Sequence, residues 1–151
     1  MLRLTPLAAA LALFAAPAFA DAPDGWKSRS VAMEPEAAVD AFLAVLGQKG
    51  ATVFKVVEHH DGAKDAGMEL PVNTVVIFGN PKLGTPMMKA APAMGAELPM
   101  KAHFTGDGDG GTTVTYTDIM AVAERHGVPT DHEAVQKAAK ALDGLTGAIA
   151  K

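Results

Sequence analysis

The sequence predicts an α+β domain in which long helices cover one face of a four- or five-stranded sheet. Two long segments repeat apolar residues at intervals of three and four, the spacing that gives a helix one apolar face. Shorter segments between them alternate between apolar and polar residues, or are apolar throughout, as strands do. A glycine-rich turn at 106–111 joins two of these strands into a predicted hairpin.

The first half of the domain is predicted as strand, helix and strand. Residues 26–33 are weakly patterned and suit a strand at the edge of the sheet. A helix is predicted to begin at Pro35, because the N–H that proline lacks would have no partner in the first turn of a helix. This helix ends at Gly50. Its apolar face holds Val39, Phe42, Leu43 and Leu46. Residues 51–57 then alternate between two faces and predict the second strand.

The second half adds three strands and two helices. Residues 72–78 are apolar on both faces for most of their length, which predicts the central strand. The hairpin strands are 100–105 and 112–117. Asp118 is predicted to cap a helix that Gly127 closes. The last helix, 131–150, carries an apolar stripe of Val135, Ala138, Ala139, Leu142, Leu145 and Ile149.

The segment between the third and fourth strands has the glycine spacing of a phosphate-binding loop. It reads Gly79-Asn80-Pro81-Lys82-Leu83-Gly84-Thr85, but the lysine that should follow the second glycine is absent. We therefore predict a turn, with Thr85 capping a short Met-rich helix that begins at Pro86. Backbone N–H groups near Thr85, with Lys82 beside them, remain able to hold an anion.

Residues 1–20 are predicted to be a secretory signal peptide. Arg3 precedes an apolar run, Pro17 breaks it, and Ala18-Phe19-Ala20 supplies the small residues of a cleavage site before Asp21. The run is too short to span a membrane. We expect a periplasmic or secreted product without membrane insertion after cleavage, made of a polar leader at 21–27 and a single domain at 28–151.

Composition narrows the function classes. The chain carries 13 Lys and Arg against 17 Asp and Glu, so an acidic surface argues against nucleic acid as a partner. It contains no cysteine, which excludes thiolate metal sites and covalently attached haem. It also lacks a Gly-x-Ser-x-Gly elbow or an evident carboxylate pair. These absences favour a binding protein over an enzyme.

One run of residues resembles a known bacterial family. The run Ile77-Phe78-Gly79-Asn80-Pro81-Lys82-Leu83-Gly84-Thr85-Pro86-Met87-Met88, together with the preceding Glu58-His59-His60-Asp61 and the later Leu98-Pro99-Met100, is similar to domain of unknown function 302. The resemblance extends from about 28 to about 128. It implies an α+β domain with helices on an antiparallel sheet, similar to the TATA-binding-protein-like class, and a homodimer. It implies no reaction.

The candidate site residues lie in two segments. His60 stands at the position of the family's histidine, and we expect it to be the metal ligand. We expect a pocket for a small apolar or planar molecule between 58–67 and 79–94, built by His60, Phe78, Asn80, Lys82, Met87 and Met88. The bland alternatives are a hydrogen-bonded surface histidine and methionines that fill core space.

Three functions follow from this site. The leading hypothesis is a periplasmic dimeric ligand-binding protein, in its sharpest form one that holds haem b non-covalently with His60 as axial ligand. The second is a copper-binding protein, in which Met87, Met88 or Met94 joins His103 around Cu(I). The third is a scaffold or interaction domain without a small ligand.

Overall fold

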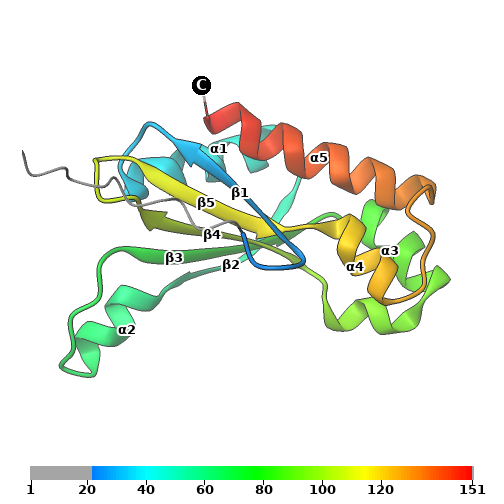
Figure 1. The fold of residues 1–151 in the computed structure, drawn as a ribbon, viewed down its shortest axis with the longest axis horizontal. Coiled ribbons are helices and arrows are strands. Elements are labelled where there is room, and N and C mark those ends of the chain that lie inside the picture. Colours follow the sequence, from blue (N-terminus) through cyan, green and yellow to red (C-terminus); the bar gives the residue numbers. More distant parts are fainter. Residues whose placement is uncertain (1–21, 151) are drawn as a thin grey trace, which may run out of the picture.

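The computed structural model describes residues 22–150, which form a five-stranded antiparallel sheet with helices packed against it (Figure 1). The predicted signal peptide lies outside the described residues. The elements are β1 (Trp26–Val31), α1 (Pro35–Gln48), β2 (Thr52–Glu58), α2 (His59–Asp65), β3 (Asn73–Gly79), α3 (Pro81–Ala90), the 3-10 helix η1 (Pro92–Ala96), β4 (Met100–Gly106), β5 (Thr112–Thr117), α4 (Ile119–Arg125) and α5 (Glu133–Ile149). The predicted fold class is confirmed.

The strands lie in the order β1-β5-β4-β3-β2, and each neighbouring pair is antiparallel. The first strand is therefore at an edge, as its weak pattern predicted. The strand predicted to be central, β3, is an interior strand, but β4 occupies the middle of the sheet. Strand order depends on contacts between distant segments, so the apolar character of β3 identified only an interior position.

The long helices form a layer on one face of the sheet. Helix α5 contacts α1, α3 and α4, and α1 lies against β3 and β4 (Figure 1). The core between the layers is centred on Phe42 of α1, which is fully buried. Its ring meets Phe78 edge-on, with centroids 5.2 Å apart, and Phe104 at a tilt, with centroids 5.4 Å apart. These three rings join the helix layer to the two strands on which the site is built.

Strands β2 and β3 form a hairpin that ends in α2 and projects from the body of the molecule (Figure 1). The register between them shifts at a β-bulge, where Phe54 has no partner in β3. Helix α2 has no buried residue. It begins at His59, and the side chain of Glu58, at the N-cap position, makes no capping hydrogen bond.

Helix α3 begins earlier than the sequence predicted. Asn80 caps it, because the Asn80 side chain accepts a hydrogen bond from the backbone N–H of Lys82 at 2.9 Å, and Pro81 takes the first helical position. The prediction that Thr85 is the cap and Pro86 the first residue is wrong, since Pro86 lies inside the helix. The segment offers two consecutive start signals, and the one with the stronger capping residue is used.

Candidate functional site

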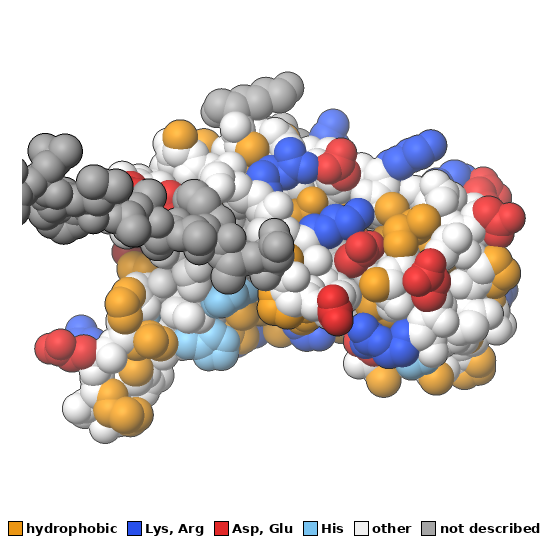
Figure 2. Space-filling model, viewed as in Figure 1, with side chains coloured by type: hydrophobic (Ala, Val, Ile, Leu, Met, Phe, Trp, Pro, Cys, Tyr) orange, Lys and Arg blue, Asp and Glu red, His pale blue; other side chains and the backbone are white. Residues whose placement is uncertain are grey.

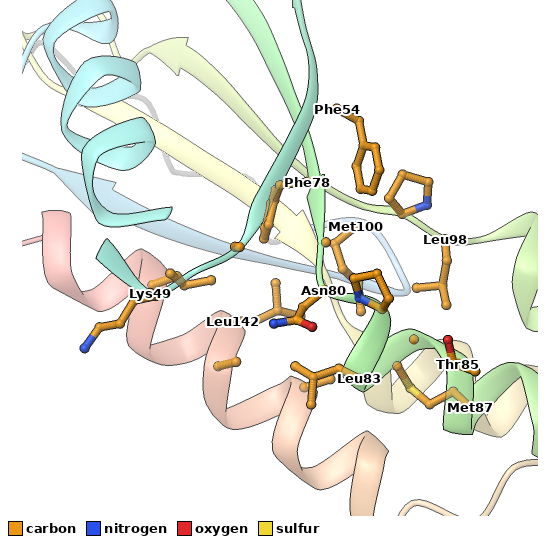
Figure 3. Close-up of a pocket in the computed structure, with 18 of the residues that line it drawn as sticks. Lys49, Phe54, Phe78, Asn80, Leu83, Thr85, Met87, Leu98, Met100 and Leu142 are labelled. Carbon is orange, nitrogen blue, oxygen red and sulfur yellow. The ribbon is translucent and has the colours of Figure 1, made fainter. Parts of the chain in front are cut away.

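The main cavity lies where β3 ends and α3 begins, and it has a volume of about 730 Å³ (Figure 3). That volume is within the usual range for sites of small molecules, roughly 300–1,000 Å³. Its walls come from the end of α1 through β2, the end of β3, α3, the segment from η1 to the start of β4, and α5. The apolar lining includes Phe54, Phe78, Leu83, Met87, Met88, Leu98, Pro99, Met100, Leu142 and Leu145.

Small residues on α5 keep this space open. The lining residues of α5 include Ala138, Ala141, Gly144 and Ala148, whose small side chains fill little of the space at these positions. A Cβ atom added at Gly144 would meet no atom within 4 Å. The cavity therefore results from the pairing of a small-residue face on α5 with the apolar residues of α3.

Polar side chains in the lining are few and share one property. They are Lys49, Asn80, Thr85 and Lys140, and each can donate a hydrogen bond. Asn80 Oδ1 is engaged by the N–H of Lys82, which leaves its amide nitrogen available, and in Figure 3 that nitrogen lies on the side of Leu142. None of the described residues that line the cavity has a carboxylate.

The structure divides the predicted site residues into two groups. Phe78, Asn80, Met87 and Met88 all line the cavity, whereas Lys82 does not. His60 lies at the other end of β3, where its ring contacts the backbone of Asn73. Seven residues of strand separate these ends, which is a distance on the order of 20 Å. The segments 58–67 and 79–94 thus do not enclose a common pocket.

His60 is held by one ring nitrogen. Nδ1 lies 3.3 Å from the backbone oxygen of Asn73 and 3.4 Å from its backbone nitrogen. The other nitrogen, Nε2, faces Asp61, whose Oδ1 is 4.0 Å away. Possible ligand atoms of Glu58, His60 and Asp61 all lie within 4.8 Å of one another. In the tautomer whose Nδ1–H donates to the Asn73 oxygen, Nε2 carries the lone pair with which histidines bind metals.

A second histidine adjoins this cluster through the same asparagine. His103 Nε2 lies 2.9 Å from Asn73 Oδ1. Because the backbone of Asn73 also contacts His60, Asn73 links β4 to the start of α2. Burial lowers the pKa of His103, and the charge of His59 lowers it further. Figure 2 shows histidine side chains at the surface where the projecting segment with α2 meets the sheet. Asn73 could not be identified from the sequence, because its contact with His103 depends on the pairing of β3 with β4.

The structure does not bring together the ligands expected for Cu(I). Met87 and Met94 are fully buried in the core. On β4, Met100, Ala102 and Phe104 point into that core, and His103 points to the opposite face of the sheet. The methionines therefore act as core and pocket-wall residues at a distance from His103.

Comparisons with known proteins give a consistent picture. The family model for domain of unknown function DUF302 matches residues 27–149. The crystal structure of an uncharacterized conserved protein DUF302 from Bacillus stearothermophilus has a TM-score of 0.74 and 14% sequence identity, and the match covers 84% of this chain and 99% of that one. At that identity the likeness shows a common fold.

Curated relatives are longer than this chain. It is 37% identical over 113 residues to fluoride-specific ion channel FluC 1 of Brucella suis biovar 1, with 75% of this chain and 43% of that protein covered. FluC 2 of Brucella melitensis biotype 1 has the same identity, with 41% of its length covered. The chain thus spans about two fifths of these relatives. Among residues 22–150, no helix is long and apolar enough to cross a membrane.

Proposed function

This chain belongs to the family of domain of unknown function DUF302, and on that premise we propose that it is a ligand-binding protein whose cavity takes an apolar or planar small molecule. The observation that carries the proposal is the cavity of about 730 Å³ between α3 and α5, with its largely apolar lining. Cavities of this kind are the usual sites of small-molecule binding.

The lining suits a ligand of variable shape. Met87, Met88 and Met100 are unbranched and flexible, so their thioether side chains adapt to the contour of a bound molecule. Phe78 is rigid by comparison, because its ring is packed edge-on against Phe42 behind it. The ligand would gain roughly 25 cal/mol for each Å² of apolar surface that it removes from water.

The proposal includes the setting predicted from the sequence, an exported protein that forms a homodimer. Amino-terminal sequencing of the periplasmic product tests whether cleavage occurs after Ala20. Sedimentation equilibrium of the mature protein tests the dimer. An uncleaved cytoplasmic product or a monomer at all concentrations would refute the corresponding part.

The cavity is tested by filling it. Gly144→Phe places a ring at the mouth of the cavity, where an added Cβ meets nothing within 4 Å. Gly47→Phe is the matched control, because Gly47 lies on α1, has the same free space and is not in the lining. Glycine weakens a helix interior by roughly 0.5–1 kcal/mol relative to alanine, so neither change should unfold the protein.

Binding is measured with the neutral fluorescent probe N-phenyl-1-naphthylamine. We expect saturable binding to the parent and to Gly47→Phe. Gly144→Phe should lose about tenfold or more in affinity, because the new phenyl ring occupies part of the cavity that the probe would fill. No saturable binding to the parent, or equal loss in both variants, would refute the proposal and leave the scaffold hypothesis.

A second candidate function is metal binding at His60, in its narrowest form the ligation of non-covalent haem b. The observation that favours it is the arrangement of His60, with Nδ1 against Asn73 and Nε2 facing Asp61. The nearby carboxylates of Glu58 and Asp61 make a set of one nitrogen and two oxygens, which suits a bare divalent cation such as Zn²⁺ better than haem iron.

The two forms separate by experiment. Haem reconstitution gives a Soret band if the narrow form holds, and Co²⁺ titration gives visible absorption if a bare cation binds. His60→Ala should remove either signal. His132→Asn is the control, because His132 caps α5 through Nδ1 and asparagine preserves a cap. Parent protein without either signal, or His60→Ala with the parent's signal, contradicts the candidate.

A further inference from the structure

The charged side chains in the cavity lining are both positive. The two charged residues in the lining are Lys49 and Lys140, and the two neutral polar residues, Asn80 and Thr85, also have donors. The chain as a whole has a formal net charge of −4. Lys49 and Lys140 are both exposed, so they place positive charge at the rim of the cavity rather than inside it, and this charge on an acidic protein favours an anion.

Asn80 determines where the polar end of a ligand would lie. Its Oδ1 accepts from the N–H of Lys82 at 2.9 Å, and this bond fixes the orientation of the amide. In Figure 3 the amide nitrogen of Asn80 lies on the side of Leu142. A side-chain donor that is oriented by a second bond loses little freedom when it binds a ligand, so it selects for an acceptor.

We propose that the natural ligand is an anionic amphiphile, with an apolar body against Phe78, Met87 and Met100 and an anionic head group that accepts from Asn80. The proposal rests on the proposed function, since it names the ligand class of the same cavity. Lys140, an exposed residue of α5 in the same lining, would supply positive charge to the head group. A hydrogen bond between a donor and a charged acceptor is about twice as strong as one between neutral groups.

A series of ligands with one chain and three heads tests the inference. Dodecanoate, dodecanol and dodecylamine compete with N-phenyl-1-naphthylamine for the parent protein. Dodecanoate should bind at least about tenfold more tightly than dodecanol, because a hydrogen bond to a charged group is worth more than one to a neutral group. Dodecylamine should bind most weakly. Equal affinities for the three would overturn the inference.

Asn80→Asp is the decisive variant. Aspartate keeps the oxygen that caps Lys82 and is as good a capping residue, so α3 should remain intact. It replaces the amide donor with a negative charge. The preference for dodecanoate over dodecanol should fall about tenfold or more, with dodecanol binding nearly unchanged. An unchanged preference would refute the assignment of Asn80.

Lys140→Gln gives an independent measure, because it removes charge without touching the cap. It should reduce dodecanoate affinity, and the remaining affinity should depend less on salt than that of the parent. Failure of the inference and failure of the proposed function are distinguishable. If the neutral probe binds and the head groups are not discriminated, the inference alone fails; if the probe itself does not bind, the proposed function fails.

Discussion

Removal of the Phe42 ring is the most severe test of the packing behind the site. Phe42 is 0% exposed, and its ring contacts Phe78 and Phe104, one from each of the interior strands β3 and β4. Phe78 in turn forms part of the cavity wall. Phe42→Ala therefore leaves a cavity at the point where the helix layer, the sheet and the binding site meet.

The expected loss in the free energy of unfolding is about 3–5 kcal/mol, the usual cost of a buried Phe→Ala change. Because domains of this size are stable by roughly 5–15 kcal/mol in total, the variant should be only marginally folded. Two aromatic contacts are lost as well, so we expect the upper part of the range. Urea unfolding followed by far-UV circular dichroism measures the difference.

Phe54→Ala is the matched control, because it is the same chemical change at a side chain that is 56% exposed. It should cost about 1 kcal/mol or less, since its ring is largely in contact with water already. A loss below about 2 kcal/mol for Phe42→Ala, or equal losses at both positions, would show that the three rings do not form the centre of the core.

Three further predictions concern pH, a helix cap and a turn. Burial, and then the charge of His59, lower the pKa of His103 from 6.5, so His103 resists protonation in the folded protein. The free energy of unfolding should therefore fall as the pH drops below the pKa of His103 in the unfolded chain and on through its pKa in the folded protein. Over this pH window, the urea midpoint of His103→Asn should depend less on pH than that of the parent. Asp118→Ala removes the acceptor for the N–H of Met120, 3.0 Å away, and should cost about 1 kcal/mol in urea unfolding, whereas Asp118→Ser should cost little. Gly127 has φ +69°, and a Cβ added there would meet no atom within 4 Å. Gly127→Ala should therefore lower the free energy of unfolding by about 1 kcal/mol through backbone strain alone, and Gly127→Asn should lower it less, because asparagine adopts this conformation more readily. Equal losses for the two variants would contradict this cause.

The elements of the fold could be predicted from the sequence wherever their signals are local. Asp118 caps α4 and Gly127 closes it, because capping depends on residues a few positions apart. The start of α3 was mispredicted although its signals are local: Asn80-Pro81 and Thr85-Pro86 are both start signals, and the prediction took the one with the weaker capping residue. Sheet order was beyond prediction, since it depends on pairings such as β1 with β5, which are separated by most of the chain.

In the candidate site, too, features set by neighbouring residues could be predicted, and features set by contacts between distant segments could not. Phe78, Asn80, Met87 and Met88 lie within one short run of the sequence, and in the structure all four line the cavity, whereas Lys82 of the same run does not. The opposite wall on α5 was missed, because small residues such as Gly144 give the same pattern on any helix that packs closely. His60 was grouped with the wrong wall, since distance along the chain does not show that a strand carries it to the far end of the sheet.

The bulge at Phe54 has a consequence for solubility. Strand β2 is an edge strand, so one side of its backbone has no partner within the described sheet, and Val53 and Phe54 expose 38% and 56% of their surface there. A flat apolar edge of this kind would be a template on which other chains add strands and aggregate. The extra residue interrupts the regular row of donors and acceptors and bends the strand, and Lys55 places a charge directly after it. The edge can therefore present apolar side chains without offering a continuous backbone to a neighbouring molecule.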